Sequence, residues 1–229
     1  MARAKSFILL STAAWVAACV ESTGPPVPES PLVRQDGELH HLKWQSTTGP
    51  RQFSVGRLDE GPLMAPVQAS GPVLDHNRLA FWAFPGRDQS IQINYRDADG
   101  AWRPYVRFSV PKGSLLRWPD GRLIASSDSV LITVSIDATT LIAQFEPTGL
   151  GFSSRVPAQL TVWYTGADPD FDGNGRVDWR DSYIERRLLG VWVQESAGDP
   201  WSGVGAVQSL SSKTFTGSLK HFSGYAVSW

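Results

Sequence analysis

Four carboxylates and one amide fall within the twelve residues 170–181: Asp170, Asp172, Asn174, Asp178 and Asp181. Oxygen ligands at this density suit calcium, a hard cation that takes about six to eight oxygens in flexible geometry. Without a cation these carboxylates would repel one another. The alternative interpretation is a solvated acidic turn that caps a helix. We favour a calcium site with a structural role, which would order an insertion between two strands.

The order of these residues resembles an EF-hand loop, most closely the dockerin kind. The resemblance implies six ligands: Asp170, Asp172, Asn174, the carbonyl of Arg176, Asp178 and Asp181. It also implies a sharp turn at Gly175 and weak affinity, on the order of 10⁻⁴–10⁻³ M. The chain departs from the pattern because segment 161–165 has a strand pattern and the twelfth residue is Asp rather than Glu. Dockerins carry two loops and this chain has one, so docking to a cohesin is not implied.

The carboxyl-terminal half carries a second resemblance. Segments 145–152, 157–162 and 219–227 resemble a ZU-type β-sandwich, the module of zonula-occludens, netrin-receptor and ankyrin proteins, with bacterial exported relatives. The resemblance spans roughly residues 106–229 and implies a sandwich fold. Some ZU-type domains cleave themselves between Phe and Ser of a His-Phe-Ser turn by an N-to-O acyl shift. Here Ser223 would attack the carbonyl of Phe222, and His221 would accept its proton. We favour the alternative, in which these residues simply enter the last strand.

The amino terminus has the pattern of an export signal. A short basic start precedes the apolar run 7–18, which is too short to span a bilayer. The run ends in Val-Ala-Ala before Cys19, the only cysteine, and this resembles the bacterial lipobox. The resemblance implies cleavage after Ala18 and a lipid on Cys19, with Val20 favouring the outer membrane in a diderm cell. The alternatives are an ordinary secretory signal and a buried cysteine.

Length, charge and composition indicate the class of protein and how the chain divides into segments. The chain has 229 residues and a formal net charge of −1, which argues against nucleic acid as the main partner. We expect a signal peptide over 1–18, a lipidated cysteine and Pro-rich tether over 19–35, and one domain over 36–229. The domain would include the calcium loop and its helix as an insertion over 170–189.

The elements that must position the loop are strands. Apolar residues alternate with polar ones in segments 90–95, 130–136, 160–164, 190–195 and 224–229. A period of two indicates sheets with one buried face. Only segment 178–189 has helical spacing, with acids in its first turn and Gly190 after its end. The sequence therefore predicts an all-β antiparallel sandwich with one short helix that follows the calcium loop.

Ten tryptophans allow a binding surface. Six lie on or beside expected strands: Trp82, Trp102, Trp118, Trp163, Trp192 and Trp201. An exposed row of them would stack on sugar rings or contact a protein, whereas the alternative is core packing. Alternation places Trp163 on the opposite face from Leu160, Val162 and Tyr164.

Known catalytic patterns are missing from the sequence. It contains no H-E-x-x-H, no P-loop and no G-x-S-x-G elbow. We therefore expect a non-catalytic surface or binding module, lipid-anchored and calcium-binding, with a glycan or protein ligand. A self-processing domain and a secreted hydrolase are the alternative functions.

Overall fold

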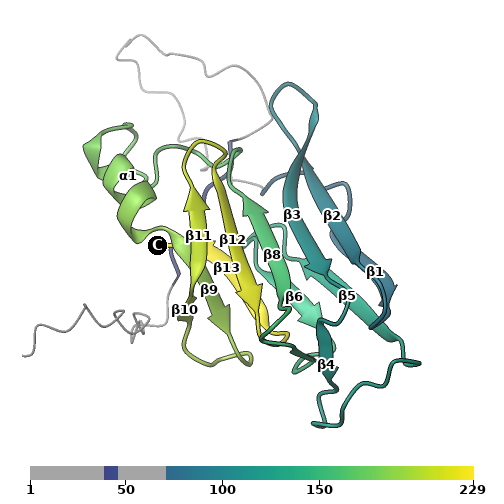
Figure 1. Ribbon diagram of the computed structural model, residues 1–229. Helices are drawn as coiled ribbons and strands as arrows, with labels where there is room; N and C mark the ends of the chain where they lie inside the picture. The colour runs from purple at the N-terminus through teal and green to yellow at the C-terminus, as the bar shows by residue number, and fades with distance from the viewer. Residues whose placement is uncertain (1–38, 46–70) are drawn as a thin grey trace, which may run out of the picture. The chain divides into compact units, whose positions relative to one another are not determined.

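Alternating apolar residues build two antiparallel sheets that pack face to face (Figure 1). The computed structural model describes residues 39–45 and 71–229. The first sheet has the order β1-β5-β6-β13-β9-β10, formed by Arg78–Ala83, Val130–Ile136, Ala143–Glu146, Gly224–Ser228, Gly190–Gln194 and Ser202–Val204. The second has the order β11-β12-β8-β3-β2, formed by Ala206–Ser209, Thr214–Leu219, Ala158–Trp163, Trp102–Val110 and Gln89–Arg96. The predicted all-β antiparallel sandwich is confirmed.

The core lies between the two sheets. In β5, the predicted inward residues Val130, Ile132, Val134 and Ile136 are all buried. A cluster of aromatic rings fills the centre, formed by Phe108, Phe145, Phe152 and Phe222. A two-stranded ribbon of β4 (Leu115–Arg117) and β7 (Gly151–Phe152) adds Phe152 to this cluster.

One helical segment interrupts the strands, as the sequence predicted. It begins as the α-helix α1 (Trp179–Tyr183) and continues as the π-helix η1 (Ile184–Leu188). The N–H of Leu189 donates to the carbonyl of Ile184 at 2.8 Å, which closes the wider turn. Gln208 of β11 donates to the Glu185 carbonyl at 2.8 Å and fixes the segment beside this edge strand (Figure 1). In the described part of the chain, no helix is long and apolar enough to cross a membrane.

The short segment 39–45 joins the sandwich from far away in the sequence. Isolated β-bridges pair His41 with Ser228 and Trp44 with Ala167. Trp44 is buried and packs edge-on against Tyr95 and Tyr105, with ring centroids 5.1 and 5.5 Å apart. This segment therefore lies against the chain that leads from β8 into the acidic loop.

Candidate metal centre

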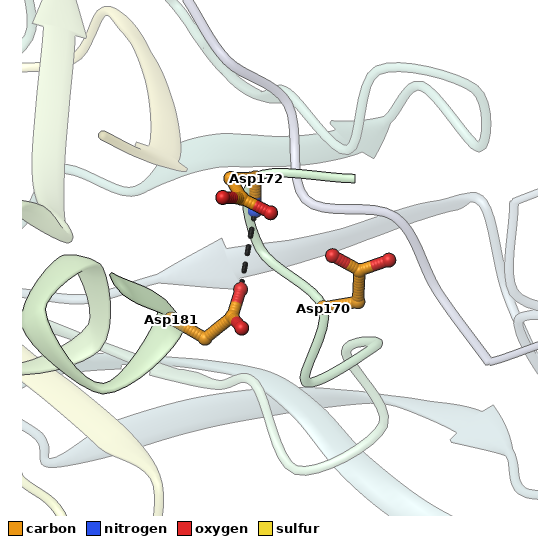
Figure 2. A group of neighbouring side chains, drawn as sticks. All are labelled: Asp170, Asp172 and Asp181. Atoms are coloured by element: carbon orange, nitrogen blue, oxygen red, sulfur yellow. Dashed lines mark hydrogen bonds between the residues drawn. The ribbon is translucent and has the colours of Figure 1, made fainter. Parts of the chain in front are cut away.

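Three carboxylates of the acidic loop come together between β8 and α1. Asp170, Asp172 and Asp181 each offer an oxygen, and these oxygens all lie within 4.8 Å of one another. Figure 2 shows the three side chains, with Asp181 on the helix and the other two on the loop. Asn174 joins the group through its amide, which donates to Asp172 at 2.9 Å. Four of the six predicted ligand residues are thus gathered in one place.

Asp181 is the buried member of the group, only 2% exposed. Its carboxylate accepts backbone N–H bonds from Phe171 at 2.7 Å, Asp172 at 3.3 Å and Asp178 at 2.8 Å. Burial by itself would raise the pKa of Asp181, but these three N–H groups hold that pKa below its ordinary value. Asp181 is therefore an ionised acceptor that joins the start of the loop to the helix.

The first half of the loop wraps around Asp170. Its carboxylate accepts the backbone N–H groups of Asn174 at 3.0 Å and Gly175 at 2.8 Å. Gly173 and Gly175 have φ of +70° and +84°, a conformation that favours glycine. The sharp turn predicted at Gly175 is present. The side-chain oxygen of Asn174 accepts the N–H of Arg176 at 2.8 Å and continues the turn.

Asp178 lies outside the three-carboxylate group, and Arg176 was predicted to contribute its backbone carbonyl rather than a side chain. Asp178 is the N-cap of α1, and its side chain accepts the N–H of Arg180 at 2.7 Å. Asp178 and Asp181 form a reciprocal capping box, in which each side chain accepts the other's backbone N–H. Arg176 is exposed.

Lys43 also lies at the loop, and the loop's own pattern did not predict it. A Cβ added at Gly173 would lie 2.6 Å from the Lys43 ammonium nitrogen. The Lys43 carbonyl accepts the N–H of Asp168 at 2.8 Å. Lys43 is separated from the loop by more than a hundred residues, so no local sequence signal could have identified it.

The donor set of the loop fits a hard divalent cation. It consists of carboxylate and amide oxygens, with no His or Cys in the group. A carboxylate has about four lone-pair positions, and Asp181 uses three of them for backbone N–H groups. Asp181 can therefore contribute one further oxygen contact, whereas Asp170 and Asp172 can contribute more. Calcium tolerates such unequal ligands because its coordination is flexible.

The His-Phe-Ser turn, residues 221–223, directly precedes the last strand, β13. The Ser223 hydroxyl donates to the carbonyl of Gln194 and, at 3.1 Å, to that of Glu195. The His221 ring lies 3.5 Å from the Glu195 carboxylate. The Phe222 carbonyl accepts the N–H of Gly149 at 3.1 Å. The structure thus directs the Ser223 hydroxyl toward two backbone carbonyls rather than toward His221.

The six strand-associated tryptophans do not form one exposed row, which corrects that hypothesis. Trp192 and Trp201 are buried with Leu39 and Ala226 in a second small cluster on the outer face of β9. Trp82 and Trp102 are exposed but belong to different sheets, and Trp118 packs on the core. Trp163 does lie opposite the buried Leu160, Val162 and Tyr164, as alternation predicted.

The predicted export elements lie outside the described residues. These are the signal peptide over 1–18, Cys19, and the tether over 19–35. Comparison with known proteins adds no family: no family model, no curated protein and no solved structure matches this chain.

Proposed function

We propose that the chain is an exported, lipid-anchored, calcium-binding β-sandwich that acts as a non-catalytic surface module. The observation that carries the calcium assignment is the convergence of Asp170, Asp172 and Asp181 within 4.8 Å. The loop that holds them has the residue order of an EF-hand. Membrane attachment through Cys19 is supported by the lipobox resemblance alone.

Calcium would act on the fold rather than on a reaction. Residues 164–178 connect β8 to α1, and α1 leads through η1 into β9 of the opposite sheet. A cation shared by Asp170, Asp172 and Asp181 would relieve their mutual repulsion and join both ends of the loop. Calcium binding would thereby stabilise the connection between the two sheets.

Calorimetric titration of the metal-free full-length chain with calcium tests the assignment. We expect one site per chain, with a dissociation constant on the order of 10⁻⁴–10⁻³ M. Asp170→Ala/Asp172→Ala should remove the binding heat. Asp120→Ala/Asp128→Ala is the matched control, because it removes the same charge from an exposed turn far from the loop in sequence. Equal binding by both double variants would exclude the loop as the site.

Lipid attachment has a separate test. In a bacterial host fed a labelled fatty acid, the wild-type chain should carry the label and sediment with membranes. Cys19→Ser should carry no label, because only a thiol forms the thioether to diacylglycerol. An unlabelled wild-type chain that is cut after Ala18 and released would instead identify an ordinary secretory signal.

A further inference from the structure

A pocket of about 500 Å³ opens at the end of the second sheet, where β8 leads toward the metal loop. Its walls come from segment 44–45, the end of β2 with the β2–β3 turn, the start of β3, the end of β8 with the chain just after it, and Ser212. Its volume falls in the range of about 300–1,000 Å³ that is usual for small-molecule sites. No residue of the His-Phe-Ser turn and no carboxylate of the metal group lines it.

The pocket contains aromatic rings from three separate segments: Trp44, Tyr95 and Trp163. Trp163 projects from the outer face of β8 and is half-buried. The guanidinium carbon of Arg107 lies 5.6 Å from the centre of the Trp163 ring, and Arg107 does not line the pocket. Arg107, on the neighbouring strand β3, therefore contacts the Trp163 ring. An indole is a surface on which the C–H face of a sugar ring can stack.

Polar groups surround these rings. Arg103 uses its Nε to bond Asp97 at 2.7 Å, and its other guanidinium nitrogens make no hydrogen bond to the described residues. The Asp99 side chain is exposed and likewise makes none. The indole N–H of Trp44 is buried behind Gly166 and does not open into the pocket. The pocket wall therefore holds donors on Arg103 and an acceptor on Asp99 beside an aromatic surface.

The charges of the lining residues cancel. Arg96 and Arg103 are balanced by Asp97 and Asp99, and Asp97 is already paired with Arg103. A strongly charged ligand would meet an equal number of like charges. A neutral ligand with hydroxyl groups can use the donors and the acceptor without leaving an excess charge buried.

The pocket wall is continuous with the metal loop. Gln45 donates its N–H to the Gly166 carbonyl at 2.9 Å, and two residues later Asp168 donates to Lys43. A Cβ at Gly166 would lie 2.6 Å from both Trp44 Nε1 and Tyr95 Cε2, so the wall closes tightly only with glycine there. An ordered loop would therefore hold this wall in place.

We infer that this pocket binds a neutral saccharide, with Trp163 as the stacking surface. The inference deepens the proposed function, since it gives the surface module a ligand class and a site. Arg103 and Asp99 would bond ring hydroxyls, while the metal loop would support the wall from outside. The site differs from the row of tryptophans that the sequence suggested, because only Trp163 of those six residues lines the pocket.

Binding of defined neutral oligosaccharides to the full-length chain tests the inference. The probes are hexamers of glucose, mannose, xylose and N-acetylglucosamine. Binding of each hexamer is measured by calorimetry and by tryptophan fluorescence. We expect at least one hexamer to bind. Trp163→Ala should weaken that binding by about tenfold or more, and Trp163→Phe should keep most of it. Trp82→Ala is the matched control, because it removes an exposed tryptophan from the other sheet and should leave affinity unchanged.

Three outcomes would overturn the inference. These are no binding by any hexamer, equal binding by wild type and Trp163→Ala, and a preference for a galacturonic acid hexamer over every neutral one. Thermal unfolding of each variant shows that it is folded. Measuring with calcium and with EDTA separates the two proposals. Sugar binding by a chain whose thermal unfolding does not respond to calcium would refute only the calcium site, and a calcium response in thermal unfolding without sugar binding would refute only the saccharide pocket.

Discussion

The carboxylate of Asp181 accepts the backbone N–H of Phe171 at 2.7 Å, across ten residues of the chain. This bond joins the first turn of α1 to the start of the acidic loop. Because Asp181 is also one of the three converging carboxylates, one buried side chain serves the loop fold and the candidate metal group.

Asp181→Ala should therefore destabilise the protein even without metal. The substitution leaves three backbone N–H groups without their acceptor and removes half of the capping box. We expect a loss of about 2–4 kcal/mol in the free energy of unfolding, measured with urea in EDTA. Asp199→Ala is the control, since this exposed aspartate follows β9 outside the loop. A loss no larger than that of the control would contradict the structural role.

Gly175→Ala should strain the loop backbone. The residue has φ of +84°, and no atom lies within 4 Å of an added Cβ, so the cost comes from conformation alone. We expect destabilisation of roughly 1–2 kcal/mol and weaker calcium binding. Gly86→Ala is matched, because its Cβ also meets open space and its φ is not positive. If the two alanine variants unfold at the same urea concentration, the turn does not need glycine.

The chain should remain uncut at Phe222-Ser223. The Ser223 hydroxyl donates to the carbonyls of Gln194 and Glu195, so its proton is not directed to His221. Phe222 is 1% exposed and packs within the aromatic core, with its ring centroid 5.0 Å from that of Phe152. Mass spectrometry after long incubation of the folded protein should show no seven-residue carboxyl-terminal fragment. Accumulation of that fragment in wild type but not in Ser223→Ala would favour self-processing.

High pH should destabilise the sandwich through Tyr105. Burial raises the pKa of its phenol above the ordinary 10.0, because the core disfavours the phenolate. Above pH 10 the unfolded chain releases this proton while the folded chain retains it, so stability falls as pH rises. Tyr105→Phe should flatten this fall while costing about 1 kcal/mol at neutral pH, since the bond to the Leu141 carbonyl is lost. Denaturant unfolding from neutral to alkaline pH measures both the loss at neutral pH and the fall in stability with pH. A Tyr105→Phe variant whose stability falls with pH as steeply as that of wild type would contradict the role of Tyr105.

Local patterns predicted the fold well because they report local burial. Alternation identified the buried side of β5 and the outward position of Trp163. Acids in the first turn and Gly190 after the end identified the one helical segment of the described residues. The π-helical second half was not predicted, because its spacing differs little from that of an α-helix over one turn.

The candidate site was predictable only where its residues lie close together in the sequence. The loop carries Asp170, Asp172 and Asp181 within twelve residues, so spacing was enough to group them. Contacts between segments that are far apart in the sequence leave no pattern of spacing that could predict them. Lys43 at the loop, Trp44 at the pocket wall and Leu39 over Trp192 all come from a segment far away in the sequence. The sequence placed Trp192 on or beside an expected strand, but it could not show that Leu39 covers this side chain.

Thermal unfolding of the full-length chain with calcium and with EDTA tests the central claim most directly. At a dissociation constant on the order of 10⁻⁴–10⁻³ M, about 5 mM calcium should add roughly 1–2 kcal/mol of stability. For a chain of this size, that gain raises the melting temperature by roughly 3–6 °C. Asp170→Ala/Asp172→Ala should show no rise, whereas Asp120→Ala/Asp128→Ala should respond like wild type. A wild-type melting temperature that is the same in calcium and in EDTA would contradict the account.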